Sequence, residues 1–97
     1  MKDNAKDKEE YLLYELLIKS GYELTSRIEK NNNFYSVNSN ELIMVLSGKI
    51  TDNLVEEIIS NKPIKVIILD SLFNDNDQLK SNSLLQFKDA EIDVNII

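Results

Sequence analysis

The feature that most constrains this sequence is the apolar run KPIKVIILD at residues 62–70. It begins beside Pro63, the only proline, and the strand that it predicts at residues 64–69 contains one charged residue, Lys65. A short run rich in Ile and Val is typical of a strand buried on both faces in a parallel sheet. The loop and helix beyond the carboxyl end of such a strand are where open α/β sheets place functional residues.

Hydrophobic periodicity predicts seven further elements around this strand. Paired apolar positions predict helices at residues 9–20, 52–61 and 77–88, and Thr51 and either Asp75 or Asp77 are expected as N-caps. Alternation and apolar runs predict strands at residues 22–30, 34–37, 41–46 and 91–97. The expected order is therefore α-β-β-β-α-β-α-β.

This order predicts an α/β fold with a single mixed five-stranded sheet and helices packed on its faces. Asparagine-rich turns at residues 31–33 and 38–40 join the first three strands into an antiparallel meander. Two strand–helix–strand crossovers then make the last strands parallel. We expect residues 9–97 to form one domain and the charged residues 1–8 to be a flexible tail or an interdomain linker.

Composition excludes several functions. The formal net charge of −6 argues against strong nucleic-acid binding by this domain alone. The chain has no cysteine and no histidine, so it cannot form a disulfide, a thiolate metal site or a Ser-His-Asp triad. We expect no cofactor or metal in this chain. The absence of a long apolar segment or a signal peptide predicts a cytoplasmic protein with no membrane partner.

Polar candidates cluster after the predicted strand at residues 64–69. Asp70, Asp77 and Lys80 are the residue types that a Mg²⁺-dependent nuclease or a receiver-type phosphoacceptor site uses. The further carboxylates and the Glu-x-Lys pattern of such sites are missing, so helix capping explains these residues more simply. Asn82, inside a helix where Asn is unfavourable, suggests a specific hydrogen bond. A small nuclease and a free-standing regulatory or ligand-binding domain with its site at residues 70–82 stay open as alternatives.

Four apolar residues are candidates for a partner interface. Tyr11 and Tyr14 flank the apolar stripe of the first helix, and Leu72 and Phe73 stand in a polar loop. Interfaces between subunits bury apolar and aromatic side chains of this kind. The simpler alternatives are that the tyrosines border the core and that the Leu-Phe pair fastens the loop to the following helix.

The segment that follows the predicted strand at residues 64–69 also carries a resemblance to a known family. Four features follow one another in the sequence: the strand that ends in Asp70, then Phe73, the run NDQLKSN at residues 76–82, and Phe87. Together they resemble the C-terminal domain of type III restriction–modification DNA methyltransferases, the Mod subunits. The resemblance extends back through LLYELLIKSGYELTSRIEK and FYSVNSNELIMVLSGKITDNLVEEII to cover nearly the whole chain after its first ten residues.

This resemblance implies a non-catalytic assembly module of a site-specific adenine-N6 methyltransferase. Members of the family use S-adenosylmethionine, act as dimers and assemble with an ATP-dependent restriction subunit. Their Asp-Pro-Pro-Tyr-type motif and glycine-rich cofactor loop are absent here, so no catalytic residue carries over. The implied partners are the rest of the methyltransferase subunit, a second Mod subunit and the restriction subunit, with DNA contacted only through the parent complex.

Overall fold

The computed structural model describes residues 5–23, 26–31 and 34–97. Three α-helices, five strands and one 3₁₀ turn are formed within these residues: α1 (Ala5–Lys19), β1 (Ile28–Lys30), β2 (Tyr35–Val37), β3 (Leu42–Val45), α2 (Asp52–Ser60), β4 (Lys65–Ile68), η1 (Asp70–Phe73), α3 (Asp77–Asp89) and β5 (Asp93–Ile96). The predicted order of helices and strands is confirmed.

The five strands form one mixed sheet in the order β1-β2-β3-β4-β5. β1, β2 and β3 pair antiparallel, whereas β3, β4 and β5 pair parallel, as the sequence predicts. In the centre of the sheet Ile43 lies opposite Ser36 on one side and Val66 on the other. Every strand therefore pairs with its neighbour in the chain, and the parallel part runs in one direction without reversing.

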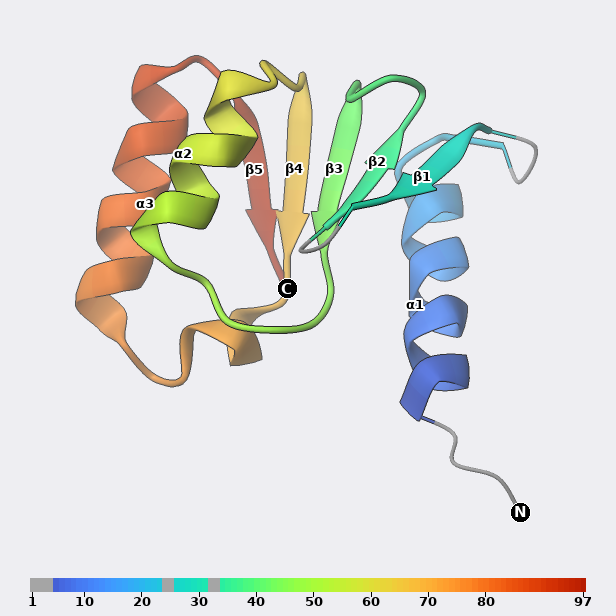
Figure 1. The fold of residues 1–97 in the computed structure, drawn as a ribbon, viewed down its shortest axis with the longest axis horizontal. Helices are drawn as coiled ribbons and strands as arrows, with labels where there is room; N and C mark the ends of the chain where they lie inside the picture. Colours follow the sequence, from blue (N-terminus) through green and yellow to red (C-terminus); the bar gives the residue numbers. More distant parts are fainter. Residues whose placement is uncertain (1–4, 24–25, 32–33) are drawn as a thin grey trace.

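The helices lie on both faces of the sheet. Both crossovers move in the same direction along the sheet, so right-handed connections place α2 and α3 on the same face. Figure 1 shows these two helices together over β4 and β5, while α1 stands apart from them beside the β1 end. The sheet is thus the middle layer between one helix and a pair of helices.

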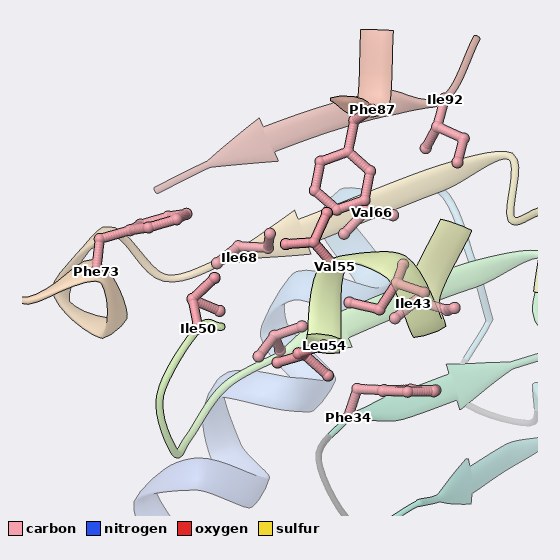
Figure 2. Packing of buried hydrophobic residues seen from close by; sticks show 12 residues of the cluster. Phe34, Ile43, Ile50, Leu54, Val55, Val66, Ile68, Phe73, Phe87 and Ile92 are labelled. Atoms are coloured by element: carbon pink, nitrogen blue, oxygen red, sulfur yellow. The ribbon is translucent and has the colours of Figure 1, made fainter. Parts of the chain in front are cut away.

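Alternation along the central strands supplies a hydrophobic core on each face. Ile43 and Val45 of β3 belong to the cluster with α2 and α3, in which Phe87 points toward Val55 and Val66 (Figure 2). Other side chains of β3 pack in a second cluster with Leu13, Leu16 and Leu17 of α1. Because both clusters draw on β3 and β4, these two strands are buried on both faces.

The edge strand β5 is polar on one side. Val94 and Ile96 are half-buried and pack against the core beneath α3, whereas Asp93 and Asn95 are exposed. This alternation is that of a strand with one covered face and one open face. Because its side chains are polar, the open face of β5 does not need to be covered by another helix or sheet.

Two elements depart from their expected bounds by four residues or more, whereas the others differ by one or two residues. α1 begins at Ala5, four residues before the expected start, so the proposed tail at residues 1–8 is helical from Ala5 onward. The part of this tail before Ala5 lies outside the described residues. The strand expected at residues 22–30 forms only as β1, and residues 24–25 and 32–33 of this hairpin also lie outside the described part.

The turn between β2 and β3 explains why β1 is short. Asn38, Ser39 and Asn40 all have positive φ angles, of 51°, 61° and 71°. The Asn38 side chain accepts a hydrogen bond from the Arg27 N–H at 3.1 Å, and the Asn38 N–H donates to the Arg27 carbonyl at 2.7 Å. β2 therefore stops at Val37, and its pairing with β1 ends at Ile28.

Candidate interaction surface

The junction at residues 70–82 is a compact turn between β4 and α3. The expected loop contains the 3₁₀ turn η1, which is followed by Asn74 and Asp75 with φ angles of 52° and 61°. Two left-handed residues in succession reverse the chain, and Asn and Asp tolerate that conformation better than most residues. The polar residues of this segment thus have a conformational role.

Asp70 and Lys80 meet across this turn. The Lys80 ammonium donates a hydrogen bond of 2.6 Å to Asp70 Oδ1, joining the end of β4 to the first turns of α3. This hydrogen bond is the main cause that raises the pKa of Lys80. Each charge is compensated by the other, and the pair links the two ends of the junction at its partly exposed surface.

The N-cap of α3 is Asn76, which corrects the expectation of Asp75 or Asp77. Asn76 Oδ1 accepts a hydrogen bond of 3.0 Å from the Leu79 N–H, as an N-cap side chain does. Asp77 lies instead in the first turn, where a negative charge favours the helix dipole. Asn82 is exposed and makes no side-chain hydrogen bond to the described residues, so the specific bond suggested by its position is not found there.

The backbone around the junction forms no crevice of the usual α/β type. Such crevices open where the strand order of a parallel sheet reverses, and β3, β4 and β5 follow one another without reversal. Among the residues that the structure describes, no three carboxylates gather where they could hold a metal ion.

Leu72 and Phe73 are placed toward the interior. Phe73 is buried in the core shared with α2 and α3, and Leu72 is half-buried against the same core. Figure 2 shows the Phe73 ring at the border of this cluster. The pair therefore fastens η1 to the core, and neither residue forms an exposed apolar surface with the two tyrosines.

Tyr11 and Tyr14, in contrast, lie on the surface of α1 together with Ile18. Their exposed fractions are 80% for Tyr11, 39% for Tyr14 and 55% for Ile18. The three residues and Glu15 line one shallow groove. We call Tyr11, Tyr14 and Ile18 the outer stripe, because they face away from the leucines that pack on the sheet.

Sequence reasoning found the two tyrosines but missed Ile18. The signal was present: Tyr11, Tyr14 and Ile18 stand at i, i+3 and i+7, the spacing of one helix face. The apolar leucines of the same helix form a second stripe with similar spacing, and that stripe packs on the sheet. Helix α1 is therefore apolar on two sides, of which the fold buries one.

Comparison with protein-family models, with curated proteins and with solved structures finds no match to this chain. Within the described ranges, no helix combines the length and the apolar character needed to cross a membrane.

Proposed function

We propose that this chain is a non-catalytic assembly module that docks through the outer stripe of α1. The observation that carries the proposal is the exposure of Tyr11, Tyr14 and Ile18 together on one face of α1, where they line a groove. Tyrosine combines a large apolar area with a polar hydroxyl, and it is enriched at interfaces between proteins for that reason.

The resemblance to type III methyltransferases gives this module a context. On that basis the chain is the C-terminal part of a cytoplasmic adenine-N6 DNA methyltransferase subunit, and it joins the rest of that subunit, a second Mod subunit or the restriction subunit. S-adenosylmethionine and DNA are then bound by the parent enzyme. This part of the proposal is supported by the residues quoted for the resemblance, since the comparisons identify no family.

The alternative of a ligand site at residues 70–82 has less support. Its best candidates, Asp70 and Lys80, already neutralise each other at 2.6 Å, and a ligand would have to replace that contact. Its apolar candidate Phe73 is buried.

The test replaces the outer stripe in the full methyltransferase subunit. The triple variant Tyr11→Gln, Tyr14→Gln, Ile18→Gln should lose the second Mod subunit or the restriction subunit during co-purification, while its circular dichroism spectrum stays unchanged. Leu85→Gln is the matched control, because Leu85 is 59% exposed on α3 and belongs to no such stripe. A fully assembled complex from the triple variant would contradict the proposal.

A second measurement addresses catalysis. Isothermal titration of the isolated chain with S-adenosylmethionine should show no binding. Tight binding would show that the module contributes to the cofactor site and would contradict its non-catalytic assignment.

A further inference from the structure

The two edge strands of the sheet differ in how well they resist further pairing. β1 is three residues long and exposes the charged residues Glu29 and Lys30. Short edge strands and charged side chains are common means by which proteins prevent another strand from adding to a sheet. β5, which Figure 1 shows at the end of the sheet opposite α1, contains Asp93 as its one charged residue and has no proline. The sequence of β5 therefore does little to block its edge.

The free edge of β5 presents the backbone groups of two residues. The N–H groups of Asp93 and Ile97 donate to carbonyls in and beside β4, at 3.2 and 3.0 Å. Successive residues of a strand direct their backbone groups to opposite edges, so the N–H and C=O groups of Val94 and Ile96 point away from β4. In the part of the chain that the structure describes, no strand pairs with this edge.

This edge is complementary to itself in one register. Two β5 strands that run antiparallel about Asn95 place Val94 of each copy opposite Ile96 of the other, and each such pair exchanges two hydrogen bonds. A shift that centres the pairing on Val94 would need the N–H of Ile92, which already donates to the Phe87 carbonyl at 2.9 Å. The hydrogen-bonding groups therefore favour a two-fold axis at Asn95.

The side chains are compatible with the same register. On the face that α3 covers, Val94 meets Ile96 of the other copy and extends the apolar core across the pair. On the open face the two Asn95 amides meet, and Asp93 lies opposite Ile97, which is 51% exposed. The two Asp93 residues are then about 13 Å apart along the strands, beyond the screening length of about 8 Å at physiological ionic strength. A parallel two-fold pair would instead place Asp93 beside Asp93.

Helix α3 adds apolar surface above this edge. Gln86 and Ala90 line a groove with α2. With about 100° between successive helical residues, Leu84 lies on the other side of Phe87 from these two residues. Since α2 and α3 lie side by side on one face of the sheet, Leu84 is on the side toward the free edge, where it is half-buried. A two-fold axis through the edge would place the α3 helices of both copies on the same face.

From these observations we infer that β5 pairs antiparallel with β5 of a second copy about a two-fold axis at Asn95, so that two domains share one continuous sheet. This interface goes beyond the proposed function, because it lies at the opposite end of the molecule from the outer stripe of α1. The backbone hydrogen bonds fix the register, and the apolar pairs of Val94 with Ile96 supply the contact beneath α3.

Hydrogen exchange of the chain tests the pairing directly. Sedimentation equilibrium at an ionic strength of about 0.15 M, which screens the net charge of −6 on each copy, should show a dimer. NMR should show that the amide protons of Val94 and Ile96 become protected as the concentration rises, because these amides have no partner in a monomer. A chain that stays monomeric up to about 1 mM, or a dimer in which both amides exchange freely, would overturn the inference.

Substitution at the axis tests the register. Asn95→Lys and Asn95→Asp each oppose like charges across the pair and should weaken the dimer about tenfold, while an equimolar mixture of the two variants should restore it. Asn82→Lys, on the exposed surface of α3, is the matched control and should leave the dimer unchanged. Wild-type affinity in both Asn95 variants, or no recovery in the mixture, would refute an axis at Asn95.

The outer-stripe variant separates this inference from the proposed function. The chain with Tyr11→Gln, Tyr14→Gln and Ile18→Gln should form the same dimer as the wild-type chain. A monomeric triple variant would place the contact between copies at α1 and overturn the inference. A dimeric triple variant that no longer binds the restriction subunit would support both proposals, because each surface would then have its own partner.

Discussion

The Tyr35 hydroxyl donates a hydrogen bond of 2.5 Å to the Glu9 carboxylate, which ties the exposed end of α1 to β2. The two residues are 26 positions apart in sequence. The contact adds a directional bond to the packing of Leu13, Leu16 and Leu17 on the sheet. It therefore sets how α1, and with it the outer stripe, is held against the rest of the domain.

Removing this bond should loosen α1. Tyr35→Phe should lower the free energy of unfolding by about 1 kcal/mol, because the Glu9 carboxylate keeps only the longer contact with the Ser47 hydroxyl, at 3.5 Å, while the ring still packs. Urea unfolding followed by circular dichroism measures the change. Glu9→Gln retains an acceptor oxygen and should cost less than Tyr35→Phe; a larger cost would show that the charge of Glu9, rather than the bond, holds the helix.

The same contact predicts a dependence on alkaline pH. Burial, followed by the hydrogen bond to Glu9, raises the pKa of Tyr35 from 10.0 to about 12. The folded state therefore retains this proton more strongly than the unfolded state does. The contribution to stability is fully present below pH 10 and is lost as the pH rises from about 10 to about 12.

Thermal unfolding between pH 8 and pH 12 measures this contribution. The wild-type chain should lose stability more steeply than Tyr35→Phe over that range, so the two melting temperatures converge. A slope should persist in the variant, because burial also raises the pKa of Tyr22. Parallel curves for the two proteins would show that Tyr35 titrates as it does in the unfolded chain.

Ser83 offers a stabilising substitution. Its side chain is fully buried in α3, and its hydroxyl oxygen has no hydrogen-bond partner within the described structure. Ser83→Ala removes a buried polar group and improves helix propensity, so it should raise the free energy of unfolding by about 1 kcal/mol. Ser81→Ala, on the exposed side of the same helix, isolates the propensity effect; an equal gain at the two positions would show that burial of the hydroxyl costs nothing.

The N-cap of α3 should be sensitive to substitution at one position. Asn76→Ala removes the acceptor of the Leu79 N–H and should cost about 1 kcal/mol in urea unfolding, whereas Asn76→Asp should preserve the cap. Gln78→Ala, on the exposed first turn, should change little. A greater loss from Gln78→Ala than from Asn76→Ala would contradict the assignment of the cap.

Leu72 and Phe73 should differ in their effects on stability. Phe73→Ala removes a buried ring and should cost about 3 kcal/mol or more, while Leu72→Ala should cost less because Leu72 is only half-buried. Chemical unfolding measures both, and Phe73→Leu provides a milder variant if the alanine protein does not fold. Similar small losses for both alanine variants would place Phe73 at the surface.

The fold could be predicted from the sequence because its strongest signals are local. The apolar run of β4, the Thr51 cap of α2 and the alternation of β5 each match the structure, and Thr51 accepts its hydrogen bond from the Leu54 N–H at 3.1 Å. Gly21 follows α1 with a φ of 89°, as a glycine at the end of a helix does. Each of these features depends on a few neighbouring residues.

The features that prediction missed depend on distant residues or on choices between equivalent ones. The length of β1 is set by where β2 ends, and hence by the left-handed residues that begin at Asn38. The N-cap of α3 could chemically be any of three neighbouring residues, Asp75, Asn76 and Asp77. The turn that η1 imposes places Asn76 at the cap position. Ile18 is exposed because the sheet covers the leucine side of α1, which the helical period alone does not decide.

The sequential strand order has a consequence for how the domain assembles as it is synthesised. Each strand joins the sheet beside the one that precedes it in the chain, so none has to be inserted between two strands that are already in place. The two antiparallel pairings close short turns, and each of the two parallel pairings closes a single helical crossover. No strand pairing joins segments from opposite ends of the chain, which favours rapid folding. The meander of β1, β2 and β3 can serve as a template while the remainder of the chain leaves the ribosome, and β5 completes the sheet last.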